Sequence, residues 1–412
     1  MRSPTVAVVM SRLRRLVVPG EPWMAALRGT LRKIAADRSN LVVADGTAGT
    51  DFVRHCALRL NVECQTIEVP NVNNSSGDDV TFRRQDAAAT GLAPNVSQPG
   101  GDEIPSRDRA LIAAADTVYV LQLRPTGNLH RLLKERIEQQ RGGIVLVDLP
   151  GLQPDVIKDE LHKAGAEIWR PTTEECRPID SGSPTVEERD NKYPLIHPHV
   201  YEIVPFPSAE GWEFLAHTTR ACPGSWPDES FEQYADSLVE SHPDANHSTL
   251  STLRRIVSQK RLIASGKTIR GGCPTVSFTA CPLENLPALH RYRTHRVRWD
   301  FEPYGLCIRR SWLQSRGVRP VRYGDEALWQ SLTEDERPFF QLAVGESGID
   351  WTIEQEWRAV GDISLKELTS DDVILFVPDF EAAKSIASVT AWPITLWPGN
   401  VEPKPLLPCK AG

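Results

Sequence analysis

The chain has 412 residues, which exceeds the roughly 250 to 300 residues at which a single hydrophobic core stops growing, so two domains are expected. Its 47 Lys and Arg residues against 54 Asp and Glu residues give a net charge of −7. This balance excludes a strongly basic chain that binds nucleic acid through bulk charge alone. No run of about 18 apolar residues occurs, so the sequence predicts a cytoplasmic protein that does not enter a membrane.

Eight cysteines are present, but none forms a C-x-x-C pair or a Cys/His cluster with the spacing of a zinc site. This pattern predicts reduced, mostly buried thiols and no metal. The sequence is compatible with a monomer or an oligomer.

From residue 5 to about 170, short β-branched runs alternate with amphipathic stretches, which is typical of a parallel sheet with crossover helices. The expected strands are Val6–Met10, Leu41–Ala44, Cys64–Val69, Thr117–Leu121, Ile144–Asp148 and Glu167–Arg170. The expected helices are Trp23–Ala36, Thr50–Leu60 and Asn128–Gln140. We therefore predict an α/β Rossmann-like N-terminal domain over residues 1–170.

Two polar segments interrupt the regular pattern. Residues 71–107 are rich in Gly, Pro and Asn without apolar periodicity, which predicts a long loop or a partly disordered insertion. Residues 171–210 combine prolines with acidic residues, which predicts a linker between domains.

The remaining residues, 211–412, mix irregular strands and helices and are expected to form an α+β C-terminal domain. The expected strands are Glu213–His217, Thr275–Thr279, Gly305–Arg309, Pro320–Tyr323, Gln355–Val360 and Val373–Pro378. The expected helices are Phe231–Val239, Leu250–Lys260 and Phe380–Ser388.

A glycine-containing turn follows the second expected strand, and a similar turn follows the fourth. Glycine turns that lead into a helix expose backbone N–H groups and a helix N-terminus, both of which favour a phosphate. Turns at the carboxyl ends of neighbouring parallel strands converge on one crevice. The alternative is that the glycines only make tight turns. The predicted site for a nucleotide or nucleotide-derived ligand comprises Gly46, Thr47, Gly49, Thr50, Thr126, Gly127 and Asn128.

With these turns, the strand Val6–Met10 and the run Ala115-Asp116-Thr117-Val118-Tyr119-Val120, residues 5–170 resemble the SLOG superfamily. This superfamily includes DprA/Smf proteins and LOG-type phosphoribohydrolases. The chain lacks the P-G-G-x-G-T-x-x-E run whose glutamate is catalytic in LOG enzymes, and Asp51 is the nearest acid. The resemblance therefore implies ligand sensing rather than LOG-type hydrolysis.

Two glutamates in the C-terminal half are candidates for chemistry. Residues two apart in a strand face the same side, so Glu354 and Glu356 are expected to present paired carboxylates. One carboxylate can hold a ribose hydroxyl while the other orients the nucleophile. The alternative is a solvated edge strand in which both glutamates lie in water, paired with Arg358.

Ser277 and Thr279 share one face of their expected strand, where their hydroxyls can bind a ligand or satisfy neighbouring backbone groups. In chain order, His217 or Arg220, then Ser277-Phe278-Thr279, then Glu354-Gln355-Glu356 resemble the motifs of the ADP-ribosyltransferase superfamily, although Phe278 departs from its S-T-S pattern. Four short runs extend this pattern: Phe278-Thr279-Ala280-Cys281-Pro282-Leu283, Tyr304-Gly305-Leu306-Cys307-Ile308, Arg319-Pro320-Val321-Arg322-Tyr323 and Glu356-Trp357-Arg358. On these runs, residues 211–380 also resemble AbiGi-like domains of bacterial abortive-infection systems.

The resemblance to ADP-ribosyltransferases implies NAD as a substrate. It implies that His217 contacts the ribose or adenosine portion of NAD and that Ser277 braces the nicotinamide pocket. Thr279 and Arg220 are further candidates for binding this cofactor. Glu356 would hold the ribose hydroxyl, and Glu354 would orient the acceptor. Nearby, residues 290–299 (HRYRTHRVRW) form the one local basic patch, which suits either phosphate contact or a solvated face.

Two functions are therefore open. The leading hypothesis is an NAD-consuming effector in bacterial stress or phage defence. It would hydrolyse NAD or transfer ADP-ribose to a protein or nucleic acid, under control of the nucleotide-sensing N-terminal domain. The alternative is a non-enzymatic nucleotide- or DNA-binding protein of DprA-like type.

Overall fold

The computed structural model describes residues 3–14, 16–47, 49–68, 81–84, 106–179, 203–242, 245–267, 269–293, 298–345 and 348–397. The chain forms two compact units, one made of residues 1–183 and 223–246 and the other of residues 184–222 and 247–412. Each unit is built on one seven-stranded sheet. No helix in the described part of the chain is both long and apolar enough to cross a membrane.

The sheet of the first unit has the strand order β4-β3-β2-β1-β5-β6-β7. Six of its strands run parallel, and β4 pairs antiparallel with β3 at the edge. This arrangement confirms the predicted Rossmann-like fold. The strands are β1 (Thr5–Met10), β2 (Asn40–Ala44), β3 (Cys64–Glu68), β4 (Thr81–Arg84), β5 (Thr117–Gln122), β6 (Gly143–Val147) and β7 (Glu167–Trp169).

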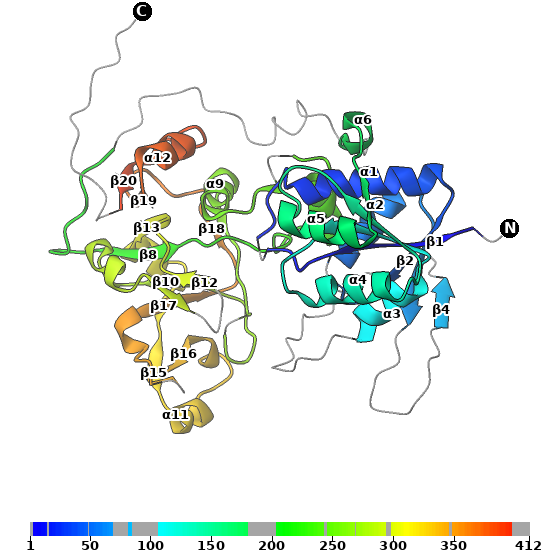
Figure 1. Ribbon diagram of the computed structural model, residues 1–412. Coiled ribbons are helices and arrows are strands. Elements are labelled where there is room, and N and C mark those ends of the chain that lie inside the picture. The colour runs from blue at the N-terminus through cyan, green and yellow to red at the C-terminus, as the bar shows by residue number, and fades with distance from the viewer. Residues whose placement is uncertain are drawn as a thin grey trace, which may run out of the picture. The chain divides into compact units, whose positions relative to one another are not determined.

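Helices cover both faces of this sheet (Figure 1). Val6 and Val8 of β1 pack with α1 (Pro22–Ala36) and α2 (Thr50–Arg59), whereas Ala7 and Val9 pack on the opposite face. That second face carries α3 (Ser106–Ala114), α4 (Asn128–Glu138) and α5 (Asp155–Ala164). Because both faces are covered, every residue of β1 is buried, as a sheet of this class requires.

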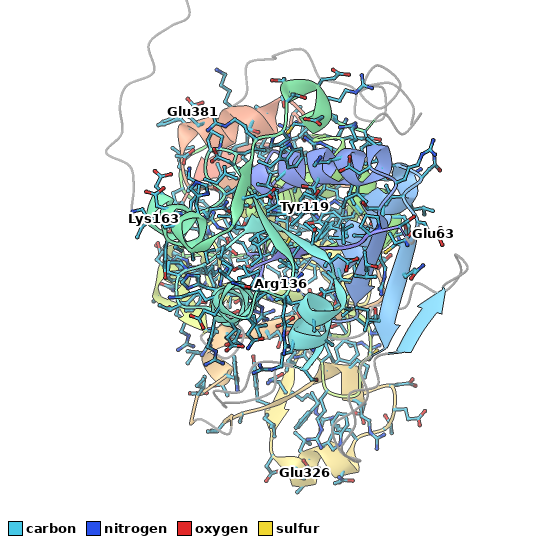
Figure 2. All side chains as sticks on the ribbon, turned by 45° about the vertical axis from the view of Figure 1, so that its right-hand side comes forward. Glu63, Tyr119, Arg136, Lys163, Glu326 and Glu381 are labelled. Atoms are coloured by element: carbon cyan, nitrogen blue, oxygen red, sulfur yellow. The ribbon has the colours of Figure 1, made fainter. Side chains whose placement is uncertain are left out.

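One buried cation ties α4 to the start of β5. Arg136, labelled in Figure 2, donates hydrogen bonds to the carbonyls of Ala115 (2.6 Å) and Asp116 (3.1 Å). Together with a hydrogen bond from Nη1 to the Ile112 carbonyl, these contacts pair both terminal nitrogens of a guanidinium that is only 3% exposed, whereas Nε has no partner among the described residues.

The predicted domain boundary differs from the structure in two places. Within the expected linker, α6 (Thr173–Cys176) has a capping box and packs on α1, where Arg28 Nε donates to the Cys176 carbonyl at 2.9 Å. Residues 180–202 lie outside the described residues. The expected helix Phe231–Val239 is α8, with those bounds, but it belongs to the first unit rather than to the C-terminal one.

Contacts with α2 hold α8 in the first unit. Asp236 on α8 accepts hydrogen bonds from His55 Nε2 at 2.7 Å and from Arg59 Nε at 2.8 Å. The ring centroids of Phe231 and Phe52 lie 5.5 Å apart. The apolar periodicity of a helix specifies a buried face but not the surface on which that face docks, which is why the sequence did not reveal this placement.

The second unit has a mostly antiparallel sheet in the order β14-β17-β10-β8-β13-β19-β20. Among the described strands of this sheet, β19 and β20 form the one parallel pair. These strands are β8 (Phe214–Thr218), β10 (Thr275–Thr279), β13 (Gly305–Arg309), β14 (Arg319–Pro320), β17 (Glu356–Val360), β19 (Val373–Val377) and β20 (Ile394–Leu396). With its helices, the unit has the predicted α+β class.

Short elements surround this sheet. The helices are α9 (Thr249–Gln259), α10 (Arg310–Gln314), α11 (Glu326–Ser331) and α12 (Phe380–Ala387), with 3₁₀ turns η2 (Leu283–Ala288), η4 (Arg337–Phe339) and η5 (Thr352–Glu354). Three strand pairs are β11 (Arg291–Arg293) with β12 (Arg298–Asp300), β15 (Arg322–Gly324) with β16 (Phe340–Leu342), and β9 (Arg261–Leu262) with β18 (Ile363–Ser364).

The structure differs from the sequence predictions for one strand and one loop. The expected strand Pro320–Tyr323 is divided, because Val321 separates β14 from β15 and the two strands join different sheets. Of the expected loop 71–107, most residues lie outside the described residues, and the described part includes the strand β4.

Candidate functional site

The carboxyl edge of the first sheet gathers the two predicted turns. β1 lies between β2 and β5 and runs parallel to both, so the segments that follow these three strands leave the sheet at one edge. The chain builds one side of the sheet from β1 to β4 and then crosses to β5, which makes β1 and β5 the switch point where open α/β sheets bind ligands. The turns at residues 46–50 and 126–128 share this edge, separated by the width of β1, about 10 Å.

The first turn depends on its glycines. Gly46 has φ 74° and Gly49 has φ 75°, which is the left-handed region that favours glycine. A Cβ added at Gly49 would lie 2.5 Å from Met10 Sδ, and one added at Gly46 would lie 3.2 Å from Arg107 Nη1. Gly49 therefore packs directly on the end of β1, and a large side chain there would disturb the fold as well as the turn.

The hydroxyls of the first turn are used inside the fold. Thr47 Oγ1 donates to the Ala44 carbonyl at 2.9 Å, and Thr50 Oγ1 lies 3.0 Å from the same carbonyl. Thr50 is buried and begins α2. The two threonines fix the turn, and the Thr50 N–H donates to the Thr47 carbonyl at 3.3 Å. The next N–H groups of α2, those of Asp51 and Phe52, have no intrahelical acceptor and are the groups suited to an anion.

The second turn is tied to the segment after β1. Arg124 donates its backbone N–H to Ser11 Oγ at 2.9 Å and its Nη2 to the Arg12 carbonyl at 2.7 Å. Thr126 has φ 55°, an unfavourable conformation for a β-branched residue, and Gly127 then caps α4, which begins at Asn128. The turn after β5 and the loop after β1 therefore form one connected rim.

Four arginines lie on this rim, which also carries the exposed carboxylates of Asp45 and Asp51. Arg12 and Arg14 follow β1, Arg107 is the second residue of α3 and lies beside Gly46, and Arg124 follows β5; all four side chains are exposed. Within the described residues, no carboxylate forms an ion pair with Arg12, Arg14 or Arg124. Exposed arginines beside helix N-termini suit phosphate oxygens, which arginine contacts through two parallel hydrogen bonds. Arg107 and Arg124 were not among the predicted site residues.

In the second unit, the two glutamates of the predicted carboxylate pair lie in different secondary-structure elements. Glu354 ends the 3₁₀ turn η5, Gln355 is left-handed with φ 43°, and Glu356 begins β17. The prediction that both glutamates occupy one strand is therefore wrong. The carboxylates still interact, because burial, and then the charges of Glu356 and Asp300, raise the pKa of Glu354 to about 7.

Glu356 is paired with a buried arginine. Arg358, 2% exposed, donates Nε to Glu356 Oε1 at 2.9 Å and Nη2 to Glu356 Oε2 at 2.7 Å. Its other N–H groups donate to the carbonyls of Pro338 and Phe340 and to Gln341 Oε1. All five guanidinium N–H groups thus have acceptors, so Glu356 completes a buried network.

The strand register separates the predicted catalytic residues. Ser277 lies opposite Arg358, and Thr279 lies opposite both Glu356 and Ala216, so Ser277, Thr279 and Glu356 share one sheet face. His217 follows Ala216 on β8 and faces the other side, where its ring lies 5.6 Å from that of Phe278. His217 therefore does not share a sheet face with Ser277, Thr279 and Glu356.

His217 and Thr279 both have structural partners. His217 Nδ1 lies 2.8 Å from the Ser277 carbonyl, and burial lowers the pKa of this imidazole to about 4. Thr279 Oγ1 donates to the Glu354 carbonyl at 2.6 Å. Arg220 lies beyond the end of β8 and is exposed, and its positive charge contributes to the low pKa of His217.

Two further charged residues, Arg293 and Asp300, lie beside Glu354. Asp300 was not among the predicted site residues. Arg293 on β11 donates Nε to Asp300 Oδ2 on β12 at 2.9 Å, and both side chains are more than nine-tenths buried. Arg293 Nη2 lies 3.6 Å from Glu354 Oε1. Arg293 belonged to the predicted basic patch, but Asp300 becomes recognisable only once the β11–β12 hairpin places it beside Arg293.

No protein-family model and no curated protein matches this chain. Among solved structures, the chain is similar to the DNA processing protein A (DprA) of Streptococcus pneumoniae, with 17% identity and a TM-score of 0.28 over 42% of this chain and 60% of that one. It is also similar to the molybdenum cofactor carrier protein of Chlamydomonas reinhardtii, with 11% identity and a TM-score of 0.27 over 41% of this chain and 91% of that one.

A third similar structure is that of DprA from Helicobacter pylori, with 15% identity and a TM-score of 0.25 over 40% of this chain and 74% of that one. Similarity at this level establishes neither a family nor an activity. The Rossmann-like assignment of the first unit depends on its own strand order and parallel pairing.

Proposed function

We propose that the first unit binds the phosphate of a nucleotide or nucleic acid at the carboxyl edge of its sheet. One observation carries this proposal: the segments after β1, β2 and β5 meet at the switch point of the sheet with four exposed arginines, Arg12, Arg14, Arg107 and Arg124. The helix N-termini of α2 and α4 add their own preference for negative charge at the same edge. This is the binding-protein hypothesis rather than the enzyme hypothesis.

The test measures fluorescence anisotropy of a labelled ATP analogue and of fluorescein-labelled single-stranded DNA with the full-length protein. Arg124→Ala and Arg107→Ala are each expected to weaken binding about tenfold, because a charge-assisted hydrogen bond contributes about 1.5 to 3 kcal/mol. Raising the salt concentration should weaken binding further.

The matched control is Arg141→Ala, which removes the same charge from an exposed residue just before β6, at the opposite edge of the sheet. Binding should be unchanged in this variant. If neither probe binds, or if Arg141→Ala and Arg124→Ala weaken binding equally, the edge site is wrong.

NAD consumption by the second unit is a second candidate, and it is favoured by one observation. Ser277, Thr279 and Glu356 share a sheet face, and the neighbouring Glu354 has a pKa near neutrality, as a group that exchanges protons requires. The position of His217 on the other face and the buried pairing of Glu356 with Arg358 weigh against it.

Release of nicotinamide from NAD by the purified protein tests this candidate, with Glu354→Gln as the informative variant. Activity that is lost in Glu354→Gln but kept in Glu367→Gln, an exposed glutamate paired with Arg316, would support it. Absence of nicotinamide release, with and without nucleotides and DNA, would exclude the candidate.

A further inference from the structure

The strand pair β11–β12 in the second unit presents two large aromatic side chains to solvent. Tyr292 and Trp299 are each 46% exposed and lie opposite each other across the two strands. Successive residues of a strand point to opposite faces, so Arg291, Arg293 and Asp300 lie on the other face, where Arg293 and Asp300 are buried. The pair of strands therefore has one aromatic face in solvent and one charged face.

The two exposed rings belong to a group of three. The ring of His290, just before β11, lies 4.6 Å from that of Trp299 at an interplanar angle of 31°, so these two rings are closer to stacked than to perpendicular. Tyr292 meets Trp299 edge to face, with the ring centroids 5.6 Å apart and 64° between the planes. Aromatic rings at these separations stabilise one another. We call His290, Tyr292 and Trp299 the aromatic face.

The charged face fixes the two strands to the rest of the unit. Arg293 Nε donates to Asp300 Oδ2 at 2.9 Å, and Arg293 Nη2 lies 3.6 Å from Glu354 Oε1. The same guanidinium lies 4.9 Å from the ring centroid of Trp351. Because these contacts already order the strands, the aromatic face is presented with little further loss of conformational entropy when a ligand binds.

The charges beside the aromatic face favour an anionic partner. Three arginines and two carboxylates form the charged cluster: Arg291, Arg293, Arg298, Asp300 and Glu354. This composition leaves net positive charge. Arg291, next to Tyr292, is partly exposed and forms no ion pair in the described part of the chain. The nearest other carboxylates along the chain are Glu284 and Glu302, and Glu302 accepts a hydrogen bond from Thr249.

A partner for the aromatic face must stack on rings and carry negative charge. Single-stranded nucleic acid has both properties, because its bases are accessible planar rings and its backbone is a polyanion. A stable protein interface buries about 800 Å² on each partner. An aromatic side chain offers only about 150 to 250 Å² when it is fully covered, so two half-exposed rings are too small for such an interface.

From these observations we infer that the aromatic face of β11–β12 is a base-stacking platform for single-stranded nucleic acid. Bases stack on Trp299 and Tyr292, while the neighbouring arginines attract the phosphate backbone. The platform belongs to the second unit, so this inference goes beyond the phosphate site of the first unit and does not depend on it.

The experiment measures fluorescence anisotropy of three fluorescein-labelled single strands of equal length with the full-length protein: oligothymidylate, oligouridylate and an abasic oligodeoxynucleotide. Trp299→Ala should weaken binding of the two base-containing strands about tenfold, as the loss of one stacked base does. The abasic strand should bind the variant and the parent equally, because it keeps the phosphates and lacks the bases. Tyr292→Ala should have the same selectivity with a smaller effect.

Two further variants serve as controls. Phe380→Ala removes an aromatic side chain that is 42% exposed at the start of α12 in the same unit, and it should change no affinity. Trp299→Phe keeps a ring for stacking and should bind the base-containing strands within about threefold of the parent. If Trp299→Phe loses as much affinity as Trp299→Ala while thermal melting shows both folded, stacking is not the interaction and the inference is overturned.

The remaining outcomes separate the platform from the phosphate site. If Trp299→Ala binds every strand as the parent does, or weakens the abasic strand equally, the platform is wrong, whereas an effect of Arg124→Ala would leave the phosphate site standing. If no strand binds but the labelled ATP analogue does, the platform alone is wrong. Self-association of the chain that is lost in Trp299→Ala, measured by analytical ultracentrifugation without any effect on strand binding, would make this face a contact between copies and would also overturn the inference.

Discussion

The two units place their polar side chains in opposite ways. In the first unit, helices cover both faces of a parallel sheet, the strand interiors are apolar and the candidate ligand groups lie on loops beyond the strand ends. In the second unit, Glu356, Arg358, Thr279 and His217 lie on the strands themselves and are largely buried. Substitutions at the first set should change binding with little effect on folding, whereas substitutions at the second set should change folding first.

The largest expected effect is that of Glu356→Gln. The change removes the charge that pairs with the buried Arg358, and breaking a buried pair in this way costs about 3 to 5 kcal/mol of unfolding free energy. Urea unfolding measures it, with the exposed Glu367→Gln as a control expected to cost less than about 1 kcal/mol. A Glu356→Gln protein as stable as the parent would show that this pair does not hold the second unit together.

Glu354 should make the second unit less stable as the pH rises. Its pKa is about 7 in the folded state against 4.5 for an ordinary glutamate, so between these values the folded protein holds the proton more tightly than the unfolded chain does. The contribution of protonated Glu354 to the free energy of unfolding is therefore lost as the pH rises through 7. The free energy of unfolding should fall by about 2 to 3 kcal/mol between pH 5 and pH 8. Glu354→Gln should flatten this slope in urea unfolding, and an unchanged slope would contradict the assignment.

His217 should have the opposite dependence. Its pKa is about 4 in the folded state against 6.5 for a free imidazole, so the unfolded chain takes up the proton first as the pH falls. The stability present above pH 6.5 should decline by about 2 kcal/mol between pH 6.5 and pH 4.5. His217→Phe should remove this acid sensitivity whatever its constant cost, and the same loss in both proteins would show that another group is responsible.

The smallest expected effect on stability is that of substituting Gly49, in the turn between β2 and α2. Gly49→Ala combines a left-handed backbone with a Cβ 2.5 Å from Met10 Sδ, whereas Gly20→Ala has φ 80° and no atom within 4 Å of the added carbon. Gly20→Ala should cost about 1 kcal/mol from the backbone alone, and Gly49→Ala about 1 kcal/mol more. Equal costs in thermal unfolding would mean that Met10 moves aside freely.

The sequence predicted the local elements well. The strands Thr275–Thr279 and Gly305–Arg309 and the helix Phe231–Val239 have the predicted bounds. Alternating or helical apolar periodicity and capping residues, such as Ser230 before α8, act over a few residues and can be read along the chain. The turns after β2 and β5 were predicted for the same reason, since glycines mark their positions.

Only the tertiary structure decided which of these elements meet. The unit that α8 joins depends on Asp236 finding His55 and Arg59, which lie far away in the sequence. The separation of His217 from Glu356 depends on the register between β8 and β10, and one residue of register reverses every side chain. Local patterns determine whether a segment is a helix or a strand, but its partners are set by long-range packing and hydrogen bonding, which no short stretch of sequence contains.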